Sequence, residues 1–209
     1  GRLNADGSTD TTFVSPFDQS FIGSIVLQPD GRILLGGSIR LIGSRVDRRF
    51  VRILANGTFD PTFAPPDGAG TGGVVQPDGK ILTSDFSFGV GSIVRLEASG
   101  ARDATFVRNF TSTTFASPFA LLPDGRVLII GDFFLPSGRQ AGIARLLPNG
   151  DFDPDFDAGI APDGLIWTAL RQDDGRIVIA GAFTTVNGVA RPGIARLAES
   201  GALDTAWVP

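Results

Sequence analysis

Five arginine–aspartate pairs are the groups in this sequence that combine a reactive residue type with a regular spacing. In each pair the aspartate follows the arginine by eight residues, and a glycine stands between them. A hairpin that turns midway sets the two side chains opposite each other on adjacent strands. The predicted chemistry is a bidentate, partly buried guanidinium–carboxylate ion pair. Its role is predicted to be structural, since a catalytic site is needed only once. The pairs are Arg2/Asp10, Arg52/Asp60, Arg95/Asp103, Arg145/Asp153 and Arg196/Asp204.

The first of these hairpins also carries oxygen ligands of the kind that calcium prefers. Asn4, Asp6 and Asp10 surround a turn at Gly7, and calcium binds side-chain oxygens that flank such turns. The other hairpins replace Asn4 by Leu54, Glu97, Leu147 and Ala198. The pattern therefore favours a turn-forming role for these residues. Calcium at Asn4, Asp6 and Asp10 is the alternative, and no other metal and no cofactor is predicted.

Any catalysis would have to use carboxylates, lysine or hydroxyl groups. The 209 residues include no histidine, cysteine, methionine or tyrosine, which removes the commonest general base and the thiolate nucleophile. Four carboxylates that could serve a glycosidase lie together at Asp151, Asp153, Asp155 and Asp157. Alternation along a short edge strand predicts that they share one solvated face. The sequence thus predicts no catalytic residue and no enzyme.

The hairpins recur because the chain is built of repeats. Their glycines lie at positions 7, 57, 100, 150 and 201, which are 43 to 51 residues apart. A period of this length is typical of propellers, solenoids and arrays. A second turn lies between successive hairpins, in which Asp bonds its own backbone and Gly takes the left-handed conformation. The turn residues are Asp30 and Gly31, Asp78 and Gly79, Asp124 and Gly125, and Asp174 and Gly175.

Short apolar, β-branched runs beside these turns predict strands. In the first repeat the runs are Ser24–Leu27, Arg32–Leu35 and Phe50–Leu54. Consecutive apolar positions indicate a sheet with both faces buried. A polar loop is predicted over Ile39–Arg48. A short fourth strand contains Pro61, and proline in a strand is typical of a sheet edge.

Four antiparallel strands in each repeat of about 50 residues, with both faces buried, predict a propeller blade. The predicted fold is an all-β β-propeller, with four blades in a single domain of residues 1–209. The repeats span about 14–63, 64–106, 107–156 and 157–207, and residues 1–13 form an extra hairpin element. No segment shows the 3.6-residue period of an amphipathic helix.

The turn and the hairpin together resemble the delta-60-type repeat of bacterial secreted and surface proteins. Its ending is matched most closely by Asn4-Ala5-Asp6-Gly7-Ser8-Thr9-Asp10 and by Ile143-Ala144-Arg145-Leu146. The resemblance covers nearly the whole chain and implies a β-propeller fold. It implies no catalytic residue, because the family carries no assigned activity. Asp85 and Ser38 depart from the residues usual in their region, so a different loop geometry is expected there.

These patterns lead us to expect a protein-interaction or adhesion scaffold, extracellular or on a bacterial cell surface, whose partner is a protein or a surface glycan. A net charge of −4 does not favour nucleic acid or anionic membranes. No apolar run reaches the length of a membrane span. Because the chain starts at Gly1, it is expected to be a mature piece or part of something longer.

Two alternatives remain for the function. The first is a structural subunit of a surface fibre or layer, in which terminal hairpins are shared between copies to give a homo-oligomer or fibre. The second is a carboxylate-dependent carbohydrate-active enzyme.

Overall fold

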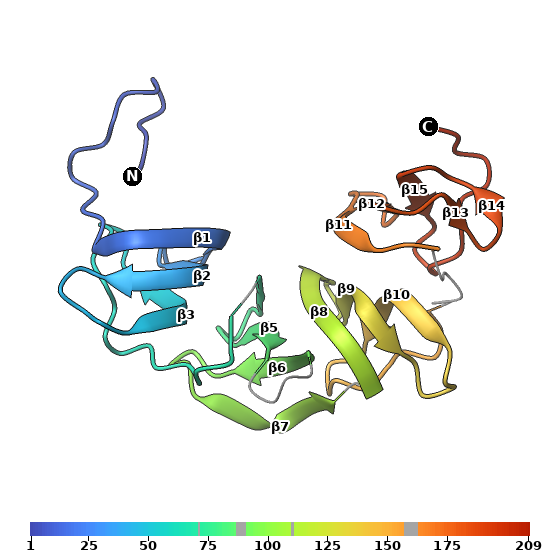
Figure 1. Ribbon diagram of the computed structural model, residues 1–209, viewed down its shortest axis with the longest axis horizontal. Coiled ribbons are helices and arrows are strands. Elements are labelled where there is room, and N and C mark those ends of the chain that lie inside the picture. Colours follow the sequence, from blue (N-terminus) through green and yellow to red (C-terminus); the bar gives the residue numbers. More distant parts are fainter. Residues whose placement is uncertain (71, 87–90, 110, 157–162) are drawn as a thin grey trace.

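Four antiparallel sheets follow one another along an open arc, and the two termini lie on opposite arms of that arc (Figure 1). The structure is a computed structural model that describes residues 1–70, 72–86, 91–109, 111–156 and 163–209. These residues contain strands and turns but no helix. Accordingly, the described part of the chain holds no helix long and apolar enough to cross a membrane. The all-β class and the four repeated sheets agree with the prediction.

Strands that are neighbours in a sheet follow one another along the chain, except that a two-stranded ribbon is inserted before the last strand of the fourth sheet. The first sheet contains β1 (Phe17–Leu27), β2 (Ile33–Leu41) and β3 (Asp47–Ile53). The second contains β4 (Val74–Val75), β5 (Ile81–Asp85), β6 (Ser92–Leu96) and β7 (Arg102–Asn109). The third contains β8 (Thr111–Leu121), β9 (Val127–Phe134) and β10 (Gln140–Leu146). The fourth contains β11 (Ile166–Arg171), β12 (Ile177–Gly181) and β15 (Ile194–Leu197), and a ribbon of β13 (Thr185–Val186) and β14 (Val189–Ala190) precedes β15.

A turn with an Asp–Gly pair joins the first two strands of every sheet. In the first sheet the Asp30 carboxylate accepts the Arg32 N–H at 3.0 Å, and Gly31 has a φ of +82°, which disfavours residues with a Cβ. The same carboxylate–amide bond recurs at 3.1, 3.0 and 3.0 Å in the other sheets. The tight turn makes the flanking strands antiparallel neighbours. The residues of the other three turns are Asp78 and Gly79, Asp124 and Gly125, and Asp174 and Gly175.

The core consists of apolar layers between consecutive sheets. Leu34 and Phe50 of the first sheet pack with Ile81, Val94 and Leu96 of the second. A larger cluster joins the second, third and fourth sheets. The second and third sheets are therefore covered on one face by the sheet before and on the other by the sheet after, which explains their uninterrupted apolar runs.

The predicted loop over Ile39–Arg48 is mostly a hairpin, so that prediction was wrong. Ile39 pairs with Arg48, and Arg40 pairs with Asp47 across β2 and β3. The Arg40 guanidinium binds Asp47 through two hydrogen bonds of 2.8 and 2.9 Å. The side chain of Ile39 is fully buried. The cross-strand ion pair and this buried anchor extend the ladder through residues whose polarity suggested a loop.

Among the residues that the structure describes, the fourth strand of the repeat is a full strand only in the second sheet, as β7. In the first, third and fourth sheets the closing hairpin makes a single bridge to the third strand, at Ile53–Phe59, Leu146–Phe152 and Leu197–Leu203. The hairpin of residues 1–13 has one bridge of its own, Leu3–Thr9. After such a bridge the chain leaves its own sheet, as the Ala64 N–H bond to Ser99 O of the next sheet shows at 2.9 Å. The hairpin thus links one sheet to the following one.

Candidate functional site

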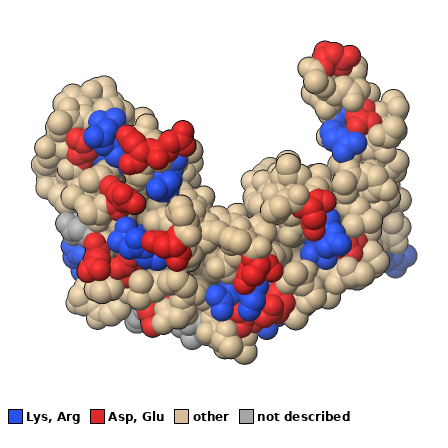
Figure 2. Space-filling view, turned by 180° about the vertical axis from the view of Figure 1, so that it is seen from behind, with Lys and Arg blue, Asp and Glu red and all other residues tan. Residues whose placement is uncertain are grey.

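The structure brings together all five arginine–aspartate pairs. The distance from the arginine Nε to the aspartate Oδ2 is 2.8, 2.7, 2.8, 2.7 and 2.9 Å in chain order. The other carboxylate oxygen accepts the N–H two residues further on in every copy. Each guanidinium also lies over an aromatic ring, at 4.6 Å from the centroid for Arg52 and Phe63. The charged clusters recur along the arc in Figure 2.

Four of these arginines also reach the following sheet. The Nη1 of Arg2, Arg52, Arg95 and Arg145 donates to the carbonyls of Ala55, Ala98, Pro148 and Glu199, at 2.7, 2.6, 3.1 and 3.1 Å. We call each closing hairpin with its ion pair a clasp, and the carbonyl that it reaches its acceptor. Arg196 has the ion pair, but among the described residues no following sheet supplies an acceptor.

Burial differs strongly between clasps. The side chains of Arg52 and Asp60 are 3% and 4% exposed, whereas those of Arg2 and Asp10 are 43% and 13% exposed. Burial raises the pKa of Asp60, but the Thr62 hydroxyl and Arg52 outweigh it, so the pKa is lowered overall. The hydroxyl of Thr12 and then Arg2 lower the pKa of Asp10 to about 2. These carboxylates are ionised at neutral pH, and an ionised carboxylate is not a general acid. A structural role for the clasps stays our prediction.

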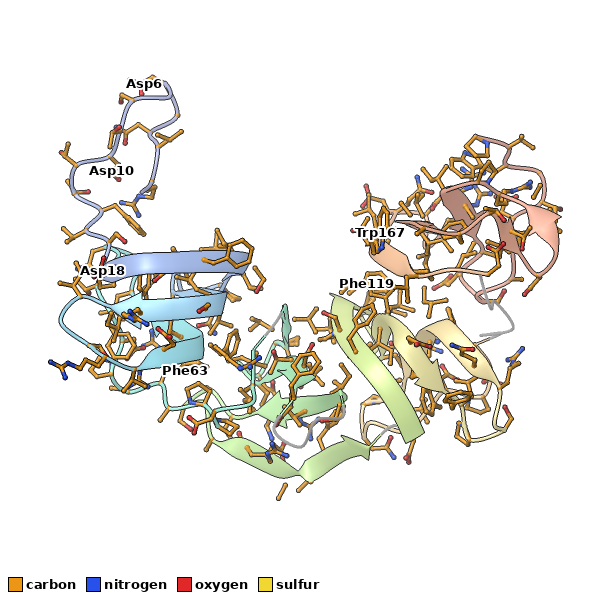
Figure 3. The ribbon with its side chains drawn as sticks, viewed as in Figure 1. Asp6, Asp10, Asp18, Phe63, Phe119 and Trp167 are labelled. Carbon is orange, nitrogen blue, oxygen red and sulfur yellow. The ribbon has the colours of Figure 1, made fainter. Side chains whose placement is uncertain are left out.

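The calcium candidates Asn4, Asp6 and Asp10 lie in the first clasp, which projects beyond the first sheet (Figure 3). Asp6 Oδ1 accepts both the N–H and the hydroxyl of Ser8, at 2.9 and 2.7 Å. Asn4 donates to Ser8 Oγ at 3.0 Å, and Arg2 neutralises Asp10. In the described ranges no group of three or more His, Cys, Asp or Glu side chains is arranged to hold a metal ion. These residues therefore form the hydrogen bonds of a turn, and calcium binding stays a prediction.

The acidic cluster predicted to share a solvated face is divided by the structure. Asp153 is buried between Arg145 and Arg126, with oxygen–nitrogen distances of 2.7 and 2.9 Å. Asp151 accepts a hydrogen bond from Asn149 at 3.0 Å. Asp157 lies outside the described residues. The expected common face is therefore wrong, because the hairpin turns Asp153 inward onto arginines.

A cavity of about 270 Å³ lies between the third and fourth sheets, and the sequence did not reveal it. Asp132 and Gln140 line it from the third sheet, and Asp163 lines it from the segment that enters the fourth. Gly131, Gly142 and Gly164 complete much of the wall. Between the first and second sheets, Ser38 stands at the position of Asp132, and Asp67 stands at the position of Asp163. Two carboxylates therefore face the cavity between the third and fourth sheets, whereas the equivalent positions between the first and second sheets hold one carboxylate.

The two carboxylates of this cavity are held in different ways. Asp163 Oδ1 accepts the N–H groups of Thr184 and Thr185, at 2.7 and 2.9 Å. The Thr184 hydroxyl and these amides lower the pKa of Asp163 to about 2. Asp132 Oδ1 accepts a hydrogen bond from the Gln140 amide at 2.6 Å. The cavity thus presents a fixed negative charge beside an amide, with backbone groups that the glycines leave accessible.

A second feature occurs only in the second sheet. Asp85 is buried on β5, and its carboxylate is paired with Arg102 of β7. In the other three sheets the Asp85 position is glycine, and the Arg102 position is Phe59, Phe152 or Leu203. A Cβ at Gly131 would overlap the carbonyl of Phe115 on the first strand of its sheet. The first strand of the second sheet spans only Val74–Val75, which leaves room for a carboxylate. The departure at Asp85 was visible in the sequence, but its partner Arg102 was not.

Solved structures similar to this chain are named for enzymes. A candidate gluconolactonase is 18% identical over 86% of this chain and 64% of its own, with a TM-score of 0.45. An endo-arabinase from Bacteroides thetaiotaomicron is 16% identical over 90% of this chain and 78% of its own, with a TM-score of 0.39. A candidate hydrolase from Bacteroides ovatus is 13% identical over 84% of this chain and 60% of its own, with a TM-score of 0.34. The chain thus spans less than two thirds of the first and third of these structures.

The prediction that the chain is not an enzyme is wrong on this comparison, since all three similar structures carry the names of enzymes. The prediction rested on the missing histidine and cysteine, and carboxylate-based hydrolysis needs neither.

A family model matches the chain four times, at residues 28–63, 76–106, 122–156 and 172–206. Each match begins at the Asp–Gly turn of one sheet and ends in its clasp. No curated protein matches the sequence. The delta-60-type assignment stays a prediction, and the broader assignment to a β-propeller repeat family is confirmed. The four matches cover more than half of the chain, so it belongs to the family described as "Domain of unknown function (DUF5122) beta-propeller".

Proposed function

We propose that the chain binds a polyhydroxylated ligand, of the carbohydrate class, in the cavity between the third and fourth sheets. The observation that carries the proposal is the convergence of Asp132, Gln140 and Asp163 from two neighbouring sheets on one cavity. Carboxylates accept hydrogen bonds from sugar hydroxyls, and an amide can both donate and accept. Junctions between packed elements with a few convergent polar groups are common ligand sites.

The charges support a neutral hydroxylated ligand over an anionic one. Asp163 is ionised at neutral pH because its pKa is lowered to about 2, and no arginine or lysine is among the lining residues. An anionic ligand would be repelled by the ionised Asp163 carboxylate. The surface glycan expected from the sequence belongs to the favoured class, and the extracellular or cell-surface location and the adhesion role remain predictions.

Titration calorimetry with a panel of neutral oligosaccharides, including arabinan fragments, tests the proposal. We expect Asp132→Asn and Asp163→Asn to weaken binding about tenfold or more. Asparagine at position 163 keeps the acceptor for the Thr184 and Thr185 amides, so the fold should be retained. Asp67→Asn is the matched control, because Asp67 occupies the position of Asp163 between the first and second sheets. Binding that is unchanged in both cavity variants would contradict the proposal.

Hydrolysis in the same cavity is a second candidate function. Two carboxylates that line one cavity are the groups that glycoside hydrolysis needs. Because Asp163 is held ionised, it fits the role of nucleophile or electrostatic stabiliser, and Asp132 is the second carboxylate of the pair. Reducing-sugar release from the same oligosaccharides, lost in Asp132→Asn, would support this function. Binding without release would support the binding module alone.

A further inference from the structure

Three asparagine–glycine pairs occur in the sequence, at Asn56–Gly57, Asn149–Gly150 and Asn187–Gly188. An asparagine in such a pair can lose ammonia without an enzyme. The backbone nitrogen of the glycine attacks the side-chain Cγ of the asparagine, and a glycine places no Cβ in the way of this close approach. The reaction needs an N–H that solvent can deprotonate and a side chain that is free to turn toward it. The fold grants these conditions unequally to the three pairs.

The first pair is held by its own turn. Gly57 is buried and donates its N–H to Leu54 O at 2.9 Å. The Asn56 Oδ1 accepts the N–H and the hydroxyl of Thr58, at 3.1 and 2.8 Å. Both the attacking nitrogen and the attacked side chain are therefore fixed by hydrogen bonds.

The second pair is held in the same way. Gly150 is buried and donates its N–H to Leu147 O at 2.9 Å. Both ends of the Asn149 amide bond Asp151, since Nδ2 donates to its carboxylate at 3.0 Å and Oδ1 accepts its N–H at 3.1 Å. These bonds must break before the side chain can reach the glycine nitrogen.

The third pair forms the loop of the β13–β14 ribbon, on the outer side of the arc (Figure 1). The φ angle is +52° at Asn187 and +76° at Gly188, as in the two-residue hairpin turn that prefers Asn-Gly. Both residues are exposed, and nothing lies within 4 Å of the place that a Cβ on Gly188 would take. Among the residues that the structure describes, neither the Asn187 side chain nor the Gly188 N–H has a hydrogen-bond partner. This pair alone keeps both reacting groups free.

The ribbon that carries this loop also holds part of the cavity wall between the third and fourth sheets. Thr184 and Thr185 donate their N–H groups to Asp163 Oδ1 at 2.7 and 2.9 Å, and the Thr184 hydroxyl bonds the other oxygen of that carboxylate. Thr185 pairs with Ala190 across the ribbon, two positions before Asn187. A change in the loop is therefore close enough to reach the groups that hold Asp163.

We propose that Asn187 is a site of spontaneous deamidation, and that its isoaspartyl product loosens the hold of the ribbon on Asp163. Solvent removes the Gly188 N–H proton, and the nitrogen forms a bond to Cγ of Asn187. The bond from Cγ to the side-chain nitrogen breaks, and ammonia leaves after taking up a proton. Water then opens the cyclic imide at one of its two carbonyls. One opening gives aspartate, and the other gives isoaspartate, whose main chain runs through Cβ.

The two products affect the loop differently. Aspartate keeps the turn, because Asp-Gly is among the pairs that this turn prefers. Isoaspartate inserts an extra carbon into the main chain of a two-residue loop, which strains the pairing of Val186 with Val189 and of Thr185 with Ala190. The Thr184 and Thr185 amides then lose their bonds to the carboxylate more often. Weaker ligand binding in the cavity would follow, and this last consequence rests on the proposed function.

Incubation of the folded chain at mildly alkaline pH, followed by peptide mapping with mass spectrometry, tests the modification. Asn187 should be converted about tenfold or more faster than Asn56 and Asn149, whose hydrogen bonds must first break. In the denatured chain the three should react at similar rates. Asn187→Gly is the matched control, because it has no side-chain amide and Gly-Gly is compatible with the same turn. Conversion of Asn187 that is no faster than that of the other two in the folded chain would overturn the proposal.

Hydrogen–deuterium exchange measures the hold on Asp163 without a ligand, so it tests the inference even if the proposed function fails. The Thr184 and Thr185 amides should exchange severalfold faster in the isoaspartyl form than in fresh protein. Incubation should leave their exchange unchanged in Asn187→Gly. The Lys80 N–H, which bonds a carboxylate in the second sheet, serves as the internal reference. Thr184 and Thr185 amides that exchange equally in the isoaspartyl form and in fresh protein would also overturn the proposal.

Discussion

The clasps and the Asp85–Arg102 pair are both guanidinium–carboxylate pairs, yet their distribution over the repeat differs. The clasp occurs in every copy, with the same atoms at 2.7 to 2.9 Å. The Asp85–Arg102 pair occurs in the second sheet alone, where the others place glycine opposite an apolar side chain. A feature that is repeated with every sheet serves the packing of sheets. A feature that breaks the repeat marks where one sheet has acquired its own chemistry.

The second sheet is distinctive beyond that pair. Thr83 and Ser84 are fully buried on β5, where the third sheet has Ile129 and Ile130. Thr83 donates to Gly72 O at 2.9 Å and Ser84 to Ala116 O at 2.7 Å. These bonds satisfy hydroxyls that would otherwise be costly to bury. The second sheet thus replaces part of its apolar layer by directed hydrogen bonds.

The largest expected effect comes from breaking a buried clasp. We predict that Arg52→Ala lowers the free energy of unfolding by about 4 kcal/mol, because Asp60 loses its guanidinium while buried. Denaturant unfolding measures the change. The control is Arg2→Ala, whose side chain is 43% exposed, and which should cost about 1 kcal/mol or less. Equal losses in the free energy of unfolding would show that burial does not determine how much each clasp stabilises the fold.

The second largest loss of stability is expected at the Asp85–Arg102 pair. Arg102→Ala is predicted to cost about 3 kcal/mol, because it removes a guanidinium that is paired with the buried Asp85 carboxylate. Asp85→Gly/Arg102→Phe installs the residues found in the third sheet and should recover most of the loss. Chemical denaturation of the three proteins compares them. If the double variant is as unstable as Arg102→Ala, the apolar arrangement cannot replace the pair.

Acid should remove the contribution of the clasps gradually. Lys80 and then the Thr105 hydroxyl lower the pKa of Asp103 below its usual value of 3.8. A carboxyl whose folded pKa is lowered stabilises the fold above the unfolded pKa, and this contribution is lost as pH falls through the folded pKa. We predict that Asp103→Asn has a lower Tm than the intact chain at pH 7. The difference should shrink below about pH 4. A Tm difference that stays constant down to pH 2 would show that the stabilisation does not depend on ionisation of Asp103.

The smallest effects are expected at the repeated turns. Asp78→Ala removes the carboxylate that accepts the Lys80 N–H at 3.1 Å, and the loss should be about 1 kcal/mol. Asp30→Ala and Asp174→Ala should cost the same, because their turns have the same bond. Thermal unfolding of the three variants measures the losses. A large spread among them would mean that the turns, like the Asp85–Arg102 pair, differ from sheet to sheet.

The sequence predicted the local features because they depend on residues close together in the chain. Asp30 and Gly31 specify a turn through their own backbone preferences, and the eight-residue spacing of Arg52 and Asp60 specifies a pair across a hairpin. The contacts between sheets depend on how sheets stack. The acceptor Ala98 O is a backbone carbonyl and leaves no mark in the sequence.

The cavity beside Asp132 and Asp163 escaped prediction for the same reason. The two residues are 31 positions apart, and they meet only because the third and fourth sheets pack together. The strand ends were misjudged where polar residues continue a ladder, as at Arg40 and Asp47.

The span of the clasps has a consequence for synthesis on the ribosome. Arg52 is followed by its acceptor 46 residues later, and Arg95 and Arg145 by theirs after 53 and 54. A newly made hairpin therefore has to wait for another sheet to emerge before its guanidinium finds the carbonyl. At about 5–20 residues per second this takes roughly 3–10 seconds. Folding is expected to advance one sheet at a time from the N-terminus. Wherever synthesis stalls, the last complete clasp would lack its acceptor carbonyl.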